Sequence, residues 1–423
     1  MRLELGIIKI KDVQFGDKTR VEDGTLVVDK KELINLLLQD DRLAEVDIDL
    51  ARPGEEVRII PVKDVIEPRV KVSGPGELFP GIIGRTSTVG SGRTNVLRGA
   101  AVVTVGRIVG FQEGLIDMTG PGADYTPFSQ TNNVALILQP VEGITRYAHE
   151  EALRLAGLRS AAYLGNAGRE VVPEEVEVYE LTLVTDTTRP RVAYVHPLLS
   201  EGLLHDTYLY GVDVKNILPT LIHPNEVMDG AIISGNCVSA CDKHTTYHHT
   251  NNAVIRELYR RHGKDLNFIG VIITNLKVTL ADKQRSSDYA SKLAKLLSAE
   301  GVIITKEGFG NPDTDVMMLC QKIEDHGIRT VLITDEFAGR DGASQSLADT
   351  VPQANALVSV GNANEVVTLP PLKRIIGDLK PVEAIAGGFD GCLAADGSVD
   401  IEIQAIMGAT CQLGFGKLAA QEY

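Results

Sequence analysis

A short stretch from Asp229 to Asn252, DGAIISGNCVSACDKHTTYHHTNN, gathers residue types that carry chemistry. It holds a Gly-Asn-Cys sequence, a second cysteine four residues later and three histidines. Thiols and imidazoles act as nucleophiles, proton carriers and metal ligands. The stretch is therefore open to four interpretations: a buried loop, a metal site, a thiol catalyst, or a peptide bond that cleaves itself.

Self-cleavage would begin at Cys237, whose thiol can attack the carbonyl carbon of Asn236. Gly235 and Asn236 are residue types that tolerate strained backbone, and strain makes the resulting thioester more accessible. Loss of the α-proton of Cys237 then expels sulfur and leaves dehydroalanine, which hydrolyses to an N-terminal pyruvoyl group. From the residues alone, a buried structural cysteine is the default explanation of an Asn-Cys pair.

Metal binding is the second chemical interpretation of this stretch. It supplies five side chains of metal-ligand type: Cys237, Cys241, His244, His248 and His249. Their spacing matches no structural zinc template, and the two cysteines do not form a C-x-x-C redox pair. On a helix, four of these side chains would share one face. We expect no metal here, although the ligand types keep the alternative open.

The surrounding elements predict an α/β fold. Strand-like runs recur after residue 190, namely RVAYVH, GAIIS, NFIGVIITN, GVIIT, RTVLITDE and ANALVSVG. Alternation with helical segments indicates βαβ units and a mostly parallel sheet with helices in the C-terminal two-thirds of the chain. Asn236 and Cys237 would then follow the GAIIS strand at its carboxyl end, where function gathers in such sheets. The first 70 residues alternate with period two, which predicts a small strand-rich, antiparallel N-terminal region.

Three helices follow from apolar spacing, the first over residues 144–164. The second has an apolar face of Tyr289, Leu293, Leu296 and Leu297. The third has a face of Val316, Leu319, Cys320 and Ile323, which places Cys320 in the core. Between residues 74 and 122 glycine is dense, which indicates sharply turning loops around one strand, AAVVTVGRIVGF.

Two loops after predicted strands, KEGFGNPDTD and TDEFAGRDGASQSL, resemble anion-binding turns at helix N-termini. Arg340 in the second loop is a candidate clamp for a substrate carboxylate. Plain helix capping at Asn311 and Asp341 is the simpler explanation. Neither loop carries a nucleotide-binding motif.

Composition excludes several classes of function. The 423 residues include 42 basic and 57 acidic side chains, for a net charge of −15. This charge argues against binding to nucleic acid or to an anionic membrane. The N-terminus has no signal-peptide pattern, and no apolar run is long enough to span a bilayer. Five cysteines are too few for a disulfide framework, which favours reduced thiols and a cytoplasmic location.

Several long segments together resemble one family over essentially the whole chain, among them GFQEGLIDMTGPGADYTPFS, EVMDGAIISGNCVSACDKHTTY, GFGNPDTD and DEFAGRDGASQSLAD. The sequence is similar to the component B proproteins of the glycine/sarcosine/betaine reductase complex, and more distantly to the D-proline reductase proprotein. The resemblance implies cleavage between Asn236 and Cys237, with a pyruvoyl cofactor derived from Cys237. It divides the chain into a strand-rich region 1–72, a glycine-rich and α/β region 73–236, and a pyruvoyl-bearing region 237–423.

The resemblance also implies an oxidoreductase reaction that needs partners. In the family's proposed mechanism, the substrate amine forms an iminium with the pyruvoyl carbonyl, and a selenolate of a separate subunit displaces nitrogen. Implied partners are the substrate-specific selenoprotein subunit of component B, the small selenoprotein A, the component C that forms acetyl phosphate, and a thioredoxin system. The sequence does not distinguish glycine, sarcosine and betaine as substrates.

Further site residues are predicted beside Cys237. Asp242, Lys243 and His244 follow closely and can titrate or donate, so they are candidates for proton transfer during processing. Arg340 is the candidate for the substrate carboxylate. The alternatives are an uncleaved amino-acid-binding or scaffold subunit and a proprotein like that of D-proline reductase. Processing distinguishes the uncleaved subunit from the self-cleaving precursor.

Overall fold

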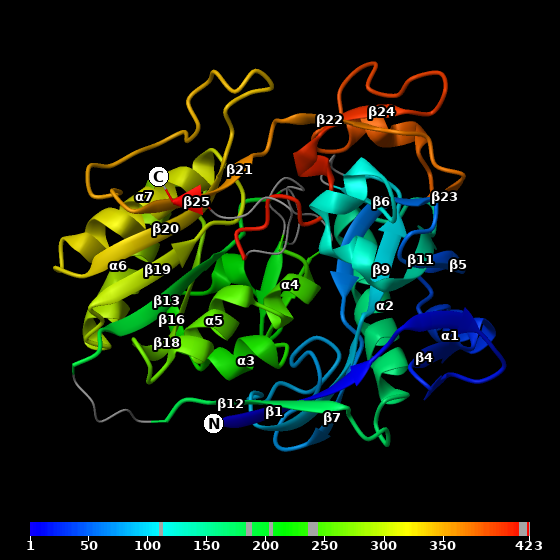
Figure 1. Cartoon of the computed structure of the whole chain (residues 1–423), viewed down its shortest axis with the longest axis horizontal. Helices are drawn as coiled ribbons and strands as arrows, with labels where there is room; N and C mark the ends of the chain where they lie inside the picture. The colour runs from blue at the N-terminus through cyan, green and yellow to red at the C-terminus, as the bar shows by residue number, and fades with distance from the viewer. Residues whose placement is uncertain (110–112, 183–187, 203–205, 236–243, 414–420, 423) are drawn as a thin grey trace.

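The computed structural model describes residues 1–109, 113–182, 188–202, 206–235, 244–413 and 421–422. Figure 1 shows two large sheets on opposite sides of the molecule, with smaller sheets at its top and bottom. The candidate chemistry lies where segments from both sides approach each other, so the two sheets are described first.

A seven-stranded sheet carries most of the predicted strands. Its order is β16 (Thr220–Ile222), β18 (Asn267–Asn275), β13 (Arg191–Leu198), β19 (Gly301–Thr305), β20 (Arg329–Glu336), β21 (Leu357–Asn362) and β25 (Gln421–Glu422). The five central strands pair in parallel, and the two edge strands pair antiparallel. Helices α6 (Leu280–Leu296) and α7 (Asn311–Glu324) pack on it around a shared apolar core. β13 therefore sits between β18 and β19, although it precedes both in the chain.

The second large sheet is mostly antiparallel. Its order is β10 (Gly114–Asp117), β6 (Val57–Ile66), β9 (Ala100–Gly106), β11 (Asn132–Pro140) and β5 (Leu43–Ala51), and β23 (Arg374–Gly377) joins it by pairing with β6. Only the β9–β11 and β23–β6 pairs are parallel. The buried ion pair of Arg58 and Asp117 links β6 to β10, with Nε–Oδ1 at 2.7 Å.

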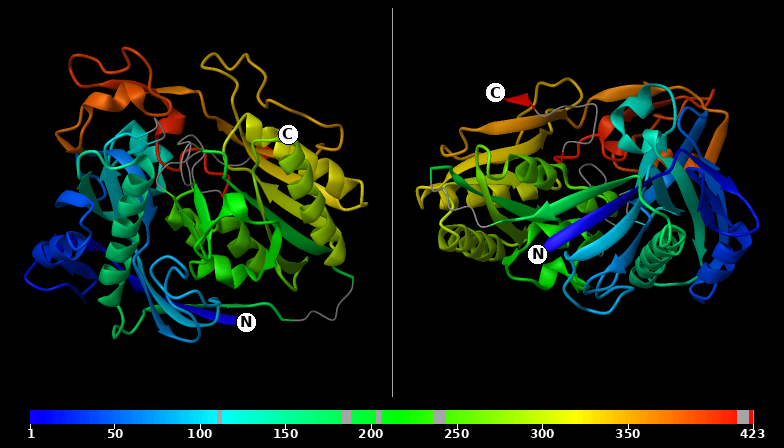
Figure 2. Two further views of the ribbon diagram at one scale, coloured as in Figure 1. Left: turned by 180° about the vertical axis from the view of Figure 1, so that it is seen from behind. Right: turned by 60° about the horizontal axis from the view of Figure 1, so that its bottom comes forward.

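Helix α2 (Arg146–Asn166) covers the six-stranded sheet, as the views in Figure 2 also show. It begins where the Thr145 hydroxyl accepts a hydrogen bond from the amide of Ala148 at 3.3 Å. Near its end, Gly165 lies directly on the backbone of Arg69, where a Cβ atom has no room. The helix predicted over residues 144–164 is therefore present, with its boundaries moved by two residues.

Smaller sheets complete the fold. One has the order β12 (Glu175–Glu180), β1 (Arg2–Lys9), β8 (Gly92–Arg98) and β7 (Arg69–Ser73). A second has the order β2 (Asp12–Phe15), β4 (Thr25–Val28) and β3 (Arg20–Glu22). A third has the order β15 (Val212–Asp213), β14 (Thr207–Leu209) and β17 (Ile232–Ser234). The last pairs β22 (Val366–Leu369) with β24 (Val399–Glu402). The β1–β8 and β2–β4 pairs are parallel, so the N-terminal region is not the antiparallel unit that its alternation predicts.

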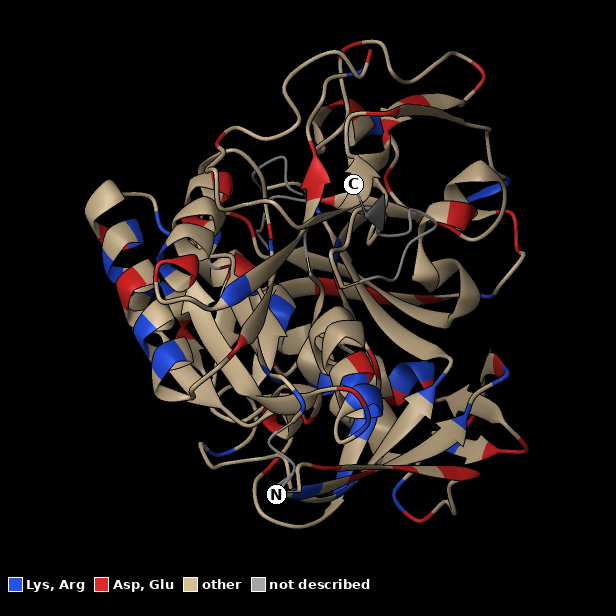
Figure 3. Ribbon diagram, turned by 60° about the vertical axis from the view of Figure 1, so that its left-hand side comes forward, with Lys and Arg blue, Asp and Glu red and all other residues tan. Residues whose placement is uncertain are grey.

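The remaining helices are short. They are α1 (Lys30–Leu37), α3 (Pro224–Met228), α4 (Thr246–Thr250) and α5 (Ala253–Arg261). Single 3-10 turns cover Pro121–Tyr125, Pro127–Gln130, Val214–Asn216, Lys380–Ala384 and Ile403–Ala405. In the described part of the chain, no helix has the length and apolar character needed to cross a membrane. Figure 3 shows the positions of basic residues (blue) interspersed with those of acidic residues (red) along the ribbon.

The α/β class is confirmed, but the mostly parallel sheet and its regional layout are not. The sheets are mixed, and β8 and β10 are strands where the glycine-dense region predicts loops. The GAIIS strand is also placed wrongly by the sequence prediction. As β17 it pairs antiparallel with β14 in a small sheet, so residues 236 and 237 do not follow a strand of the parallel sheet.

The two helices on the seven-stranded sheet show why burial is hard to predict. In α7, Val316, Leu319, Cys320 and Ile323 are all buried, as predicted. In α6 the predicted face is half right: Leu293 and Leu297 pack half-buried against the core, but Tyr289 is 42% and Leu296 70% exposed. The fully buried positions of the helix are Ala290, Ala294, three serines and Lys283, most of them small side chains that allow close packing. The loop around Asp341 starts no helix, whereas α7 does begin at Asn311, with Gly310 as its N-cap.

Candidate functional site

The predicted cleavage residues Asn236, Cys237, Asp242 and Lys243 lie outside the described residues, as does Cys241. The structure describes what flanks them, Gly235 on one side and His244 on the other. The site is therefore built from these two flanks and from the groups that surround them.

Thr246 ties the two flanks together. Its hydroxyl accepts a hydrogen bond from the amide of Ser234 at 3.0 Å and donates one to Oδ2 of Asp64 at 2.7 Å. Its own amide donates to Oδ1 of Asp64 at 3.0 Å. Asp64 lies on β6, so a side chain of the six-stranded sheet fixes both ends of the segment 236–243 at one buried place.

Three buried histidines gather beside this junction. His196 lies near the carboxyl end of β13, His244 directly precedes α4, and His249 lies on α4. One ring nitrogen from each lies within 4.8 Å of the other two. Nε2 of His196 is 3.4 Å from Nδ1 of His249. The chain thus brings together imidazoles from sequence positions almost fifty residues apart.

Two of the three rings are oriented by a polar neighbour outside the cluster. Nε2 of His244 lies 2.9 Å from Oε1 of Gln412, and Nδ1 of His196 lies 3.0 Å from the hydroxyl of Tyr194. Glu307 fixes the backbone, because its two oxygens accept from the amides of His244 and Leu199 at 3.0 Å each. The positions of these rings are therefore set by the fold.

Burial keeps the rings of His196, His244 and His248 uncharged. It lowers the pKa of His244 to about 4 and holds the pKa of His196 and His248 well below the ordinary value of 6.5. A neutral imidazole offers a lone pair, which can accept a hydrogen bond or bind a metal cation.

Asp206 is a second unusual group beside the junction. Its backbone carbonyl accepts a hydrogen bond from the amide of Gly235, the residue immediately before Asn236. Burial raises the pKa of its carboxyl group to about 7, against the opposing effect of Lys215, 3.7 Å away. Oδ2 accepts from the amide of Gly202 at 2.7 Å, whereas Oδ1 is buried with no hydrogen-bond partner among the described residues.

Arg340, the predicted carboxylate clamp, is engaged elsewhere. Its Nε donates to Oε1 of Glu402 at 2.7 Å, and its guanidinium carbon lies 3.8 Å from the ring centroid of Phe389. Of the predicted residues that the structure describes, His244 lies among the buried groups at the junction, and so does His249, one of the predicted metal-ligand side chains. The role of Arg340 stays a prediction, and a substrate carboxylate there would compete with Glu402.

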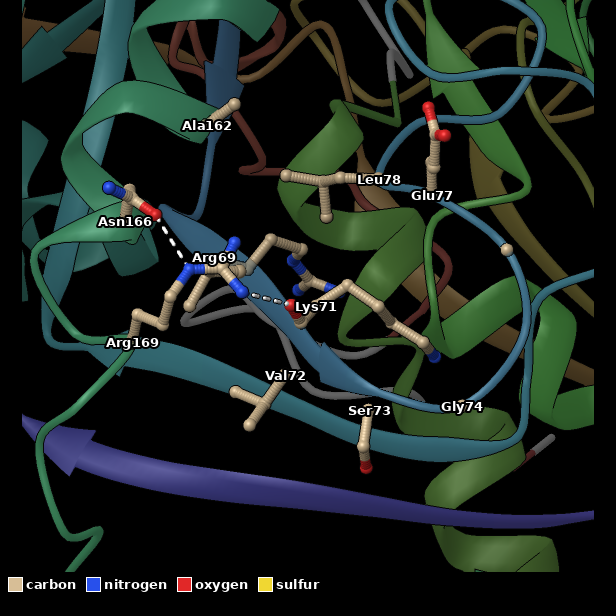
Figure 4. Close-up of a pocket in the computed structure, with 12 residues that line it drawn as sticks. Arg69, Lys71, Val72, Ser73, Gly74, Glu77, Leu78, Ala162, Asn166 and Arg169 are labelled. Atoms are coloured by element: carbon tan, nitrogen blue, oxygen red, sulfur yellow. Dashed lines mark hydrogen bonds between the residues drawn. The ribbon is translucent and has the colours of Figure 1, made fainter.

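A cleft of about 370 Å³, shown in Figure 4, lies away from this junction. Two of its cations are paired with carboxylates: Arg69 donates to Glu67 at 2.8 Å, and Lys71 contacts Asp229. Among the described residues, Arg169 donates to neutral oxygens, the carbonyl of Lys71 at 3.0 Å and the side chain of Asn166 at 2.9 Å. None of the groups that form the junction lines this cleft.

Sequence reasoning missed His196, Asp206, Glu307 and Gln412. A signal existed for His196, because RVAYVH ends a predicted strand in a titratable side chain. Glu307 lies in the loop KEGFGNPDTD, which drew attention for anion binding but not for contact with His244. Asp206 and Gln412 follow no motif and reach the site only through tertiary structure.

Comparison with known proteins decides the family. The family model for glycine/sarcosine/betaine reductase component B subunits matches residues 1–421. The chain belongs to this family. It is 60% identical to the glycine reductase complex component B subunits alpha and beta of Acetoanaerobium sticklandii, and 57% identical to the sarcosine reductase complex component B subunit alpha of Peptoclostridium acidaminophilum. Both alignments cover all of each chain.

A more distant relation is also confirmed for this family member. The D-proline reductase proprotein of Acetoanaerobium sticklandii is 22% identical over 352 residues, which cover 76% of this chain and 53% of the relative. No solved structure matches the chain significantly.

Proposed function

We propose that the chain is the self-cleaving precursor of a component B that activates an amine substrate for reductive C–N cleavage. One observation carries this proposal: a relative whose name gives two subunits, alpha and beta, aligns over its whole length with this single chain. Two subunits from one sequence require a break. The distant relative named a proprotein supports the same reading.

The proposed break lies between Asn236 and Cys237. The sulfur of Cys237 bonds to the carbonyl carbon of Asn236, and the C–N bond between the two residues breaks. A base then takes the α-proton of Cys237, and its Cβ–S bond breaks, so that sulfur leaves with the Asn236 acyl group. Water finally replaces the α-nitrogen, which is released as ammonia, and a pyruvoyl group remains.

The described surroundings fit such a group. Thr246 holds the described residues on both sides of the segment that contains the proposed break. Asp206 presents a buried carboxyl oxygen with no described partner next to Gly235. A carboxyl group with its pKa raised to about 7 suits proton transfer near neutral pH, which makes Asp206 a candidate base beside the predicted Asp242, Lys243 and His244.

A bound pyruvoyl carbonyl supplies an electron-withdrawing partner for a substrate amine. The chain's own residues would hold the substrate beside it and exclude water. Reduction would need the predicted partners: the substrate-specific selenoprotein subunit, selenoprotein A, component C and a thioredoxin system. The cytoplasmic location predicted from the cysteines belongs to the same proposal.

Intact-mass measurement under denaturing, reducing conditions tests the cleavage. We expect two fragments joined in the precursor at 236/237, the second blocked to N-terminal sequencing and reactive towards hydroxylamine. Cys237→Ala should leave one uncut chain, whereas the matched control Cys320→Ala, at a buried core thiol, should still be cut.

A single uncut chain in folded wild-type protein would favour the uncleaved binding or scaffold subunit. Fragments that persist in Cys237→Ala would assign the cut to an external protease. Acetyl phosphate formation with the purified partners, from glycine, sarcosine or betaine in turn, then identifies the substrate.

A further inference from the structure

We propose that His196, His244 and His249 together bind one divalent first-row transition metal ion, with Zn²⁺ as the best match. This site does not depend on the proposed function, because its ligands lie outside the bond that is cut. It also revises the expectation, drawn from cysteine and histidine spacing, that the chain holds no metal here.

The distances suit a single ion. Zinc–nitrogen bonds of about 2.0–2.1 Å in a tetrahedral site place neighbouring ligand nitrogens about 3.3 Å apart. Nε2 of His196 and Nδ1 of His249 are 3.4 Å apart, and a nitrogen of His244 completes a set within 4.8 Å. The third ring therefore needs only a small movement to reach the same ion.

Hydrogen bonds on the far sides of two rings point the right lone pairs inward. The Gln412 carbonyl oxygen can only accept a hydrogen bond, so Nε2 of His244 carries the hydrogen and Nδ1 keeps the lone pair. That Nδ1 is buried and has no hydrogen-bond partner among the described residues. In His196, the Tyr194 hydroxyl can accept from Nδ1, which frees Nε2 for the ion. Metal-binding histidines are commonly oriented by such partners.

A cluster of histidines held only by hydrogen bonds accounts for these contacts less well than a bound metal ion does. A His196–His249 bond at 3.4 Å is long, and it leaves the buried Nδ1 of His244 unsatisfied. One cation satisfies all three nitrogens. The buried Glu307 carboxylate, which accepts from the His244 amide, provides negative charge nearby.

The types of the ligands narrow the choice of metal ion. Three neutral imidazoles suit zinc and its neighbours, whereas calcium and magnesium prefer oxygen ligands. Three protein ligands leave a fourth position open, as in catalytic rather than structural zinc sites. That position would take water or a small anionic or amine ligand.

Metal analysis of the full-length protein tests the site. We expect about one zinc per chain after expression in zinc-supplemented medium. Chelated protein given Co²⁺ should develop the visible absorption of a tetrahedral nitrogen-ligated ion. His196→Ala and His249→Ala should lose the metal, and the matched control His326→Ala, at an exposed histidine, should keep it. Gln412→Leu, which removes only the orienting partner, should weaken binding about 10- to 100-fold.

Circular dichroism and cleavage are recorded on the same samples. Wild-type protein that is folded but takes up neither zinc nor Co²⁺ overturns the metal site, whatever its cleavage state. Ligand variants that keep full metal content also overturn it. If those variants fail to fold, the Co²⁺ spectrum of the wild type and the Gln412→Leu affinity decide. An uncut chain with normal metal content contradicts only the proposed function.

Discussion

Asp206 gives the sharpest quantitative prediction, which concerns the substitution Asp206→Asn. The asparagine keeps the size of the side chain and can still accept the hydrogen bond from the Gly202 amide through its carbonyl oxygen. What it removes is a buried group that must ionise as the pH rises.

The direction and size of the effect on stability follow from the raised pKa of Asp206. The ordinary value is 3.8 and the folded value about 7, so the folded chain holds this proton more tightly than the unfolded chain. Below pH 4 the carboxyl group is protonated in both the folded and the unfolded chain, and the protein has its full stability. The free energy of unfolding then falls by about 4 kcal/mol in all as the pH rises to about 7. Divided by the unfolding entropy of a chain of this length, this loss corresponds to about 5 °C in melting temperature.

Thermal melting at pH 4 and pH 8 is the assay. Both proteins carry Cys237→Ala, so that each melts as one uncut chain. The asparagine variant should melt about 5 °C higher than its parent at pH 8, with the difference vanishing near pH 4. Asp17→Asn, at a side chain that is 96% exposed, should show no such divergence. A constant difference across this range would refute the reasoning that Asp206 ionises inside the folded protein.

Three further substitutions test the packing that positions the site. Arg58→Met should lower stability by about 3–5 kcal/mol in urea melts, because it strands the buried carboxylate of Asp117, and adding Asp117→Leu should recover much of the loss. Gly165→Ala should cost about 1–3 kcal/mol because its Cβ meets backbone, whereas Gly301→Ala, with its nearest contact at 3.7 Å, should change the melting point little. Thr246→Val should cost about 2 kcal/mol of stability, since it leaves the Ser234 amide and the Asp64 carboxylate without their hydrogen bonds to the hydroxyl. It should also slow cleavage on a gel time course. Unchanged cleavage would show that these hydrogen bonds are not needed for processing.

Local patterns predicted the elements of this fold better than their arrangement. The α7 face was predictable because its large apolar side chains recur at helical spacing. The α6 face was only half predictable, since Leu293 and Leu297 pack against the core but most of the fully buried positions are alanine and serine, which carry no hydrophobic pattern. The pairing of β23 with β6 links residues more than 300 positions apart and leaves no local trace in the sequence.

The candidate site likewise has residues that the sequence predicts and residues that only the fold brings together. His244 was predictable from its closeness to Cys237, because chemistry concentrated in one short stretch is visible by inspection. His196 and Gln412 reach the same place from β13 and from the C-terminal segment, and only the fold makes them neighbours. Asp206 stood out only after its burial was known, since an aspartate in a loop is usually solvated.

The position of β13 between β18 and β19 has a consequence for how the mature protein holds together. A cut after residue 236 would leave β13 in one product and both of its neighbours in the other, while β23 of the second product extends a sheet of the first. The two products would then share β-sheets, joined by backbone hydrogen bonds between their strands, rather than meet at a surface interface. Scission must then come after folding, and the two pieces should elute together until a denaturant dissolves the sheets that join them.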